Sequence, residues 1–324
     1  MTIFRWFSTF SLMFQQQAEI FMTRNCRIFL MCLFPARMLA AQEIALTFDD
    51  APIADGFYFT GAARTETLIT KLKNQNVPQV AFYCVSTRAD STGRARLRRY
   101  AEAGHIIANH SHSHTRIQQL GAAGYIQDVF KADAILRELP GFKPWFRFPF
   151  LDEGRTIADR DAIRKALNER GYFNGYATVD NYDWYFDRLF QAALREKKKV
   201  DYEKLEQLYL EHLWQSLSFY DQMALAALGR SPKHVLLLHE NDLAALFVDS
   251  LIEFLRAKGW KIISPAEAYQ DSIATMIPNV LLNNQGRVAA LAKASGYTGK
   301  FSQDSEDERF LEKLFEQQRV FQTE

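Results

Sequence analysis

Two short segments of this chain carry residues that could hold a metal ion and activate water. The adjacent carboxylates Asp49 and Asp50 end an apolar run that begins at Ile44. Downstream, three of the seven histidines of the chain alternate with serines between residues 110 and 114. One carboxylate and two neutral imidazoles make a ligand set that leaves zinc an open position for water, and the second carboxylate could take the proton of that water. This pairing predicts a hydrolase.

Each segment also has an ordinary structural explanation. An Asp-Asp pair after a strand is common in solvated turns and helix caps, because short acidic side chains accept hydrogen bonds from loop backbone groups. The histidine cluster is harder to explain in this way, since three imidazoles fall within five positions next to an apolar run. A metal-binding role is therefore the stronger interpretation of the histidines.

Further titratable side chains occur at the ends of other apolar runs. Arg147 lies in the aromatic run 145–150, Asp183 follows another run, and His239 ends the run 235–239. Taken singly, these residues could be a surface charge, a helix cap and a strand-end histidine. Polar residues at the C-terminal ends of successive parallel strands are, however, where α/β barrels keep their chemistry. Their shared position favours a single site.

The spacing of the histidines bears on which of them could share a metal ion. In an extended segment His110, His112 and His114 would all lie on one face, whereas in a helical turn only the first and last would do so. Because we expect a helix to begin near Thr115, we assign His110 and His114 to the metal. His112 is not expected to bind the metal. Its alternative role is to interact with the residues that do.

The chain resembles the polysaccharide deacetylase family, also known as the NodB-homology domain or carbohydrate esterase family 4. Its five motifs can be matched in order between about residues 44 and 240. Together they are a far more specific signal than any one of them. The matched segments are residues 47–50, 110–115, 147–150, 180–184 and 236–239.

The resemblance implies catalytic and metal-binding roles for residues of the first three motifs. Asp49 would be the catalytic base, and Arg147 would orient it. A divalent metal, with zinc as the expected ion, would be held by Asp50, His110 and His114.

The same resemblance implies the groups that would act on the substrate. The backbone N–H of Phe150 would stabilise the oxyanion, and His239 would be the acid, tuned by Asp183. Trp184 in the fourth motif is expected to line the substrate cleft.

The sequence departs from the family pattern at two turns. Ala51 stands where the family usually has glycine, so the turn after the Asp pair must accept a Cβ atom. Phe150 and Leu151 stand where the family usually has tyrosine and glycine. A backbone N–H donor survives the loss of the phenol hydroxyl, whereas the shape of the substrate cleft depends on these positions.

Composition narrows the choice of partners. The 39 basic and 38 acidic residues give a net charge of +1, which offers no electrostatic surface for nucleic acid or an anionic membrane. A neutral polymer or a small sugar suits this balance better. The length of 324 residues, 48% of them hydrophobic, allows one large catalytic domain with extensions.

The first 41 residues have the features of a targeting segment. If translation starts at Met22, a basic start is followed by the short apolar run 28–34 and by small residues before Gln42. The apolar run is too short to span a bilayer. Removal of the segment would leave Cys84 as the only cysteine, so no internal disulfide could form. We expect an exported protein, periplasmic or secreted, without an integral membrane span.

Apolar runs alternate with helical patterns in a βα rhythm that predicts a parallel sheet or barrel. The family resemblance implies a distorted, incomplete (β/α) barrel of about seven parallel strands. The strands are expected at residues 44–49, 80–84, 105–109, 144–150, 175–180, 234–239 and 260–264. The helices are expected at residues 62–74, 94–103, 117–138, 158–170 and 241–258.

Two segments fall outside this plan of a catalytic domain over residues 42–269. Residues 185–230 form an insertion that predicts two amphipathic helices, either padding the barrel wall or acting as a lid over the cleft. Residues 270–324 form a C-terminal extension with a charged helix at 305–318 and no catalytic signature.

These expectations converge on a metal-dependent hydrolase that removes acetyl groups from N-acetylated sugars or polysaccharides. An O-acetyl esterase acting on xylan-like polymers is the alternative within the enzymes, because the same site cleaves esters. A carbohydrate-binding protein that keeps the fold without turnover is the alternative outside them. The joint presence of base, metal ligands and acid argues against this last alternative.

Overall fold

Residues 41–322 are the part of the chain that the computed structural model describes. The expected targeting segment, residues 1–41, lies outside this part except for its last residue. Among residues 41–322, no helix is both long and apolar enough to cross a lipid bilayer.

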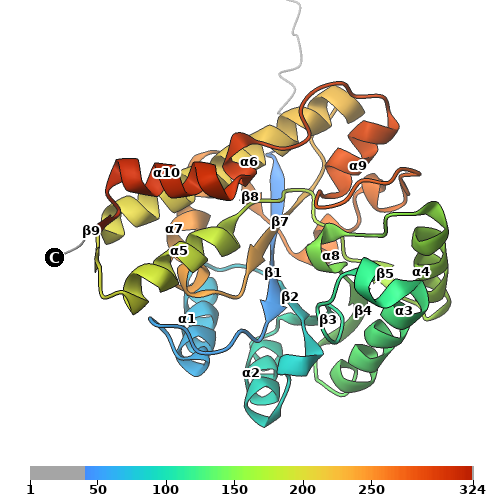
Figure 1. Ribbon diagram of the computed structural model, residues 1–324, viewed down its shortest axis with the longest axis horizontal. Coiled ribbons are helices and arrows are strands. Elements are labelled where there is room, and N and C mark those ends of the chain that lie inside the picture. The colour runs from blue at the N-terminus through green and yellow to red at the C-terminus, as the bar shows by residue number, and fades with distance from the viewer. Residues whose placement is uncertain (1–40, 323–324) are drawn as a thin grey trace, which may run out of the picture. The chain divides into compact units, whose positions relative to one another are not determined.

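A parallel sheet forms the centre of the described part (Figure 1), as the βα rhythm predicted. The strands are spatially ordered β5-β4-β3-β2-β1-β7, and β8 also pairs with β1. The sheet curls into a half-barrel, and a single bridge between Val179 and Leu236 continues it beyond β7. The strand bounds are β1 (Glu43–Ala51), β2 (Ala81–Cys84), β3 (Ile106–Asn109), β4 (Phe142–Phe146), β5 (Phe173–Asn174), β7 (His234–His239) and β8 (Lys261–Ile262).

Helices follow most strands and cover the sheet, so the central strands are buried on both faces and are mostly apolar. Most of these helices begin where the side chain of a Thr, Asp, Asn or Ser residue accepts a backbone N–H, as expected for N-caps. The helices are α1 (Gly61–Asn74), α2 (Ser91–Glu102), α3 (Ile117–Leu136), α4 (Ile157–Glu169), α7 (Asp242–Ala257) and α8 (Pro265–Ala268).

The main hydrophobic core lies between the sheet and these helices. Phe48 of β1 stacks on Phe82 of β2, with ring centroids 5.2 Å apart. Leu68 of α1, Leu97 of α2 and Leu251 of α7 pack into the same cluster and are at most 1% exposed. Each leucine buried in this way contributes about 1.5–3 kcal/mol relative to an exposed one. This core fixes the strands whose ends carry the candidate site.

Three predicted strands are much shorter than expected or absent. The strand predicted at residues 144–150 ends at Phe146, because the chain turns into a 3-10 helix at Pro149–Leu151 in which Phe150 has a φ of 59°. The strand predicted at 175–180 is absent except for the bridge at Val179, because β5 ends before it at Asn174. The strand predicted at 260–264 is reduced to Lys261–Ile262. The five predicted helices of the barrel all form, although Gly121, at φ 67°, interrupts α3 after its first turn.

The insertion forms the two predicted helices, and it packs against the C-terminal extension. The short strands β6 (Lys199–Val200) and β9 (Phe321–Gln322) pair antiparallel. Phe186 and Phe315 also meet, with ring centroids 4.8 Å apart. The helices of these two segments are α5 (Asp183–Arg195), α6 (Tyr202–Leu228), α9 (Arg287–Ala294) and α10 (Glu308–Gln318).

Candidate metal and catalytic site

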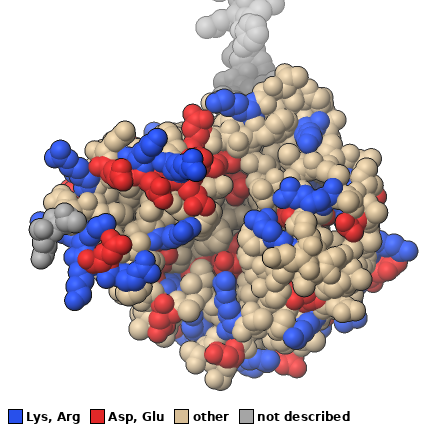
Figure 2. All heavy atoms as spheres, viewed as in Figure 1, with Lys and Arg blue, Asp and Glu red and all other residues tan. Residues whose placement is uncertain are grey.

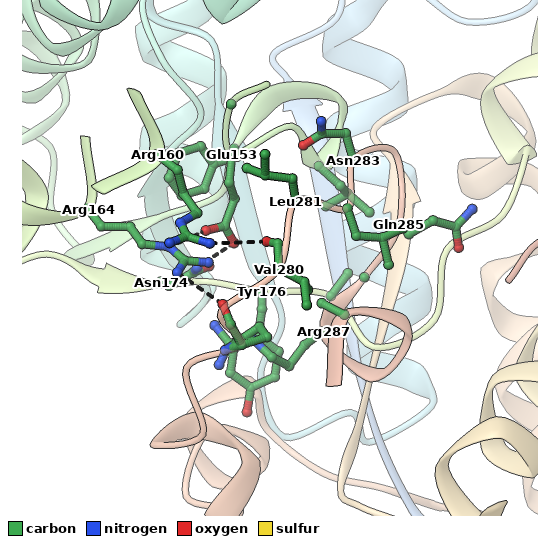
Figure 3. Close-up of a pocket in the computed structure, with 18 of the residues that line it drawn as sticks. Glu153, Arg160, Arg164, Asn174, Tyr176, Val280, Leu281, Asn283, Gln285 and Arg287 are labelled. Atoms are coloured by element: carbon green, nitrogen blue, oxygen red, sulfur yellow. Dashed lines mark hydrogen bonds and ion pairs between the residues drawn. The ribbon is translucent and has the colours of Figure 1, made fainter. Parts of the chain in front are cut away.

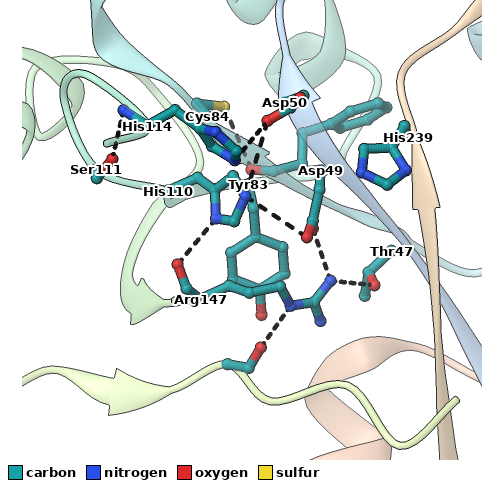
Figure 4. A network of polar contacts seen from close by, with 12 residues as sticks. Thr47, Asp49, Asp50, Tyr83, Cys84, His110, Ser111, His114, Arg147 and His239 are labelled. Carbon is teal, nitrogen blue, oxygen red and sulfur yellow. Dashed lines mark hydrogen bonds and ion pairs between the residues drawn. The ribbon is translucent and has the colours of Figure 1, made fainter. Parts of the chain in front are cut away.

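The candidate residues meet at the C-terminal ends of the parallel strands (Figure 4). In the register of β1 against β7, Asp49 lies beside His239. In the register of β3 against β4, Asn109 lies beside Phe146, so the residues that follow them, His110 and Arg147, also become neighbours. Parallel pairing therefore brings together side chains that are up to 190 positions apart in the sequence.

One carboxylate and two imidazoles form a compact cluster of potential metal ligands. Ligand atoms of Asp50, His110 and His114 all lie within 4.8 Å of one another. Asp50 Oδ1 is 3.2 Å from His114 Nε2 and 3.8 Å from His110 Nε2. This oxygen is buried and has no hydrogen-bond partner among the described residues. Because a buried carboxylate oxygen without a partner is unfavourable, the cluster fits a divalent cation that this oxygen could bind.

The histidines of the cluster are in the form that binds metal. His110 Nδ1 donates to the carbonyl oxygen of Arg147 at 2.8 Å, which leaves the lone pair on Nε2, the atom nearest Asp50. Burial lowers the pKa of both His110 and His114 to about 4, so both rings are neutral near pH 7.

Asp49 sits beside this cluster, held by a buried arginine. Arg147 donates to Asp49 Oδ1 at 2.7 Å and to Thr47 Oγ1 at 2.8 Å, and its guanidinium lies 4.0 Å from the centre of the Tyr83 ring. Burial raises the pKa of Asp49 above its ordinary value, and the charge of Arg147 opposes this rise without cancelling it. A carboxylate with a raised pKa is a stronger base once ionised, and Arg147 fixes its direction.

His239 faces the cluster from β7 and is paired with a buried carboxylate. Its Nδ1 lies 2.6 Å from Asp183 Oδ1, and its backbone N–H donates to Asp183 Oδ2 at 2.8 Å. Burial alone would lower the pKa of His239, but the charge of Asp183 and the hydrogen bond to it raise the pKa to about 9. The ring is therefore protonated near pH 7, and Nε2–H is the proton left free to donate.

Left-handed backbone conformations gather around the candidate site. Five residues other than glycine have φ between 49° and 71° there. Such conformations cost about 1–3 kcal/mol each and persist where the surrounding structure imposes them, which is common at functional sites. Ala51 is not among them, so its Cβ atom is accepted without strain. The five residues are Asp50, Ser111, His114, Phe150 and Leu151.

The geometric reason given above for choosing His110 and His114 is wrong. Residues 110–116 form neither a strand nor a helical turn, and Ser111 and His114 have left-handed φ values of 71° and 55°. It is this turn that places the two rings 5.0 Å apart. His112 does point elsewhere, since its Nδ1 lies 2.8 Å from Ser86 Oγ.

Comparisons with known proteins show what part of the chain is similar to them. The family model for polysaccharide deacetylases matches residues 37–172. A peptidoglycan-N-acetylglucosamine deacetylase from Bacillus cereus is 30% identical over 143 residues, which cover 44% of this chain and 46% of that protein. This part of the chain belongs to the polysaccharide deacetylase family. The chain spans about half the length of this relative.

Solved structures of carbohydrate esterase family 4 resemble this chain in fold alone. A family 4 carbohydrate esterase from Streptomyces lividans in complex with acetate is 21% identical, with a TM-score of 0.47 over 70% of this chain and 95% of that one. A family 4 pseudoenzyme from Bacillus anthracis is 16% identical, with a TM-score of 0.49 over 71% of this chain and 66% of that one. Likeness at this level carries no functional conclusion.

The matched segment includes only part of the candidate site. Asp49, Asp50, His110, His114 and Arg147 fall within the matched residues 37–172, whereas Asp183, Trp184 and His239 lie beyond them. The structure nevertheless places His239 beside Asp49 and Asp183 beside His239.

A hollow of about 580 Å³ opens over the cluster, and acidic side chains border it in Figure 2. Phe150 and Trp184 both line it, and the ring of Phe150 packs 4.5 Å from that of His114. The far wall comes from the C-terminal extension, which sequence reasoning left without a role because no motif marks it. Its lining residues are Asn283, Asn284, Gln285, Ser302, Glu306 and Glu308.

Proposed function

We propose that the chain is a metal-dependent hydrolase that removes acetyl groups from N-acetylated sugars or polysaccharides. The observation that carries this proposal is that potential metal ligands, a base and an acid lie around one hollow. A buried carboxylate oxygen without a partner lies between two neutral imidazoles, with a buried base and a protonated histidine close by. The family to which residues 37–172 belong supports the same reaction.

Asp50, His110 and His114 would hold the metal, and we propose zinc. A zinc ion bound there would lower the pKa of a water molecule and polarise the acetyl carbonyl. The ligand set of one carboxylate and two histidines is common for catalytic zinc, and it leaves room for water and substrate.

The residues of the chain would then divide the proton transfers. Asp49 would take the proton of the attacking water as the new carbon–oxygen bond forms, and Arg147 would hold Asp49 in place. The backbone N–H of Phe150 would stabilise the negative charge on the carbonyl oxygen, a contribution of about 3 kcal/mol for a well-placed donor. His239 would give the proton on Nε2 to the leaving nitrogen as the carbon–nitrogen bond breaks, which yields acetate and a free amine.

The raised pKa of His239 favours amide cleavage over ester cleavage. An amine leaves only once it is protonated, whereas an alkoxide needs less help from an acid. A site that serves esters alone would gain little from the buried Asp183 that keeps His239 charged.

A comparison of two substrates tests this proposal. We expect His239→Ala to reduce kcat/KM for an N-acetylglucosamine oligomer far more than for an activated aryl acetate. Asp49→Asn should reduce both, because each reaction needs an activated water. Equal losses on both substrates for His239→Ala would favour an O-acetyl esterase and remove His239 from the role of leaving-group acid.

We also propose that the protein is exported to the periplasm or secreted, with residues 42–269 as its catalytic domain. The support is the basic and apolar pattern that begins at Met22 and the small residues before Gln42. Mass spectrometry of the protein from its native host should find an N-terminus near residue 41 or 42. An intact residue 1 in the cytoplasm would contradict export.

A further inference from the structure

A loop of the C-terminal extension, residues 278–286 and here called the cleft loop, is clamped from one side by buried or half-buried arginines (Figure 3). Arg160 donates to the carbonyl oxygen of Val280 at 3.3 Å, and Arg164 donates to that of Pro278 at 3.1 Å. The small cavity behind the loop, about 30 Å³, has room for about one water molecule. The cleft loop is therefore part of the fixed structure.

The other side of the cleft loop forms a wall of the catalytic hollow. Asn283 and Gln285 line both the small cavity and the hollow, so the loop separates the two. Asn283 Oδ1 is buried and has no hydrogen-bond partner among the described residues. Gln285 Nε2 donates to Glu306 Oε2 at 3.0 Å, and the Tyr220 hydroxyl donates to Glu306 Oε1 at 2.9 Å. These contacts hold the carboxylate of Glu306 at the edge of the hollow.

Burial raises the pKa of Glu306, and no basic side chain among the described residues pairs with its carboxylate. Glu308, which also lines the hollow, lies 3.6 Å from Arg188, and Asp49 is paired with Arg147. Within residues 41–322, Glu306 forms no ion pair, and its partners there are neutral donors. Asp180 also lines the hollow, and its pKa is raised first by burial and next by the charge of Glu306. A negatively charged group of a ligand would therefore be repelled by the carboxylate of Glu306 at this side of the hollow.

We propose that the wall formed by Asn283, Gln285 and Glu306 holds the sugar next to the acetylated one and selects neutral or amine-bearing sugars over sugars that carry a carboxylate. This inference rests on the proposed deacetylase function and adds a substrate preference to it. A hollow of about 580 Å³ is within the range for drug-sized ligands, so it has room for more than one acetylated sugar. Amide and carboxylate groups are suitable partners for sugar hydroxyls and for the ammonium group of a deacetylated sugar.

Two isosteric variants that change the charge of the wall in opposite directions test the proposal. Glu306→Gln removes a negative charge and Asn283→Asp adds one, each with little change of shape. The substrates are a neutral N-acetylglucosamine oligomer and a glycan of equal length in which every second sugar carries a lactyl carboxylate. The measured quantity is the ratio of kcat/KM for the neutral glycan to that for the acidic glycan, with acetate release as the readout.

The proposal predicts that the wild-type protein prefers the neutral glycan. Glu306→Gln should lower the ratio by about fivefold or more, because a carboxylate of the ligand then meets one negative charge fewer. Asn283→Asp should raise the ratio, because it adds a negative charge to the wall. Glu316→Gln, on the exposed side of α10, is the matched control and should leave the ratio unchanged.

The outcomes separate this inference from the proposed function. A wild-type protein that releases acetate from neither glycan would contradict the proposed function itself. A wild-type protein that is active, with ratios unchanged in both wall variants, would overturn the wall inference alone. Equal losses on both glycans together with a lower melting temperature would also overturn it, because Glu306 would then have only a structural role.

Discussion

Replacing Asp183 by asparagine should move the alkaline limit of activity. Asp183 lies 2.6 Å from His239 Nδ1, and its charge is what raises the pKa of His239 to about 9 against the opposing effect of burial. Asparagine can still accept the hydrogen bond from Nδ1–H, but it carries no charge. In Asp183→Asn the pKa of His239 should therefore fall to the ordinary value of about 6.5 or below it.

The size of the effect follows from the fraction of His239 that is protonated. At pH 8 a group with a pKa of about 9 is ~90% protonated, whereas one with a pKa of about 6.5 is only ~3% protonated. If His239 is the leaving-group acid, kcat/KM for an N-acetylated oligomer at pH 8 should fall about 30-fold. The loss should be much smaller near pH 6, where most of the histidine is protonated in both proteins.

The assay is a profile of kcat/KM between about pH 5 and pH 10 for the wild-type protein and for Asp183→Asn. The alkaline limb of the profile reports the acid in the free enzyme, so it should move to lower pH in the variant. Asp249→Asn, a charge change on α7 outside the hollow, should leave the limb in place. An alkaline limb that stays where it is in Asp183→Asn would refute the assignment of His239 as the acid.

Two further predictions follow from the same site. His110→Ala should lose bound divalent metal whereas His112→Ala should retain it, as measured by elemental analysis of the purified proteins; the reverse pattern would overturn the ligand assignment. Arg147→Met should lower the free energy of unfolding by about 3–5 kcal/mol, because it leaves Asp49 buried without its ion-pair partner. Urea denaturation measures this, and an unchanged midpoint would show that the buried pair contributes nothing to stability.

The sequence was a good guide wherever a signal was local. The apolar run before Asp49 predicts β1, and the parallel arrangement follows from the alternation of such runs with helical patterns. Because parallel strands place their C-terminal ends at one edge of a sheet, the residues after several runs could be expected to converge. In the structure Asp49 does lie beside His239, and Asp183 contacts His239.

The parts that could not be predicted depend on long-range contacts or on unusual backbone conformations. A left-handed φ such as that of His114 is uncommon for any residue other than glycine, so the turn that brings this ring to His110 has no signature in the sequence. The strand predicted at 175–180 is mostly lost, because only Val179 forms a β-bridge with a neighbouring strand.

The C-terminal wall of the hollow shows the same limit. Glu306 comes from an extension without catalytic motifs, and it is held by Gln285 of the cleft loop and by Tyr220 of α6. Tyr220 lies 86 positions away from Glu306, and no periodic pattern links the two residues. Such contacts become visible only when the insertion and the extension are seen packed together.

Acetate release from an N-acetylglucosamine oligomer, measured with and without a chelator, tests the central claim most directly. The account predicts release by the purified protein, loss of activity when the metal is removed, and recovery when zinc is added back. Asp49→Asn should remain inactive with zinc present, because the base is then missing. Full activity in the metal-stripped protein, or in Asp49→Asn, would contradict the account.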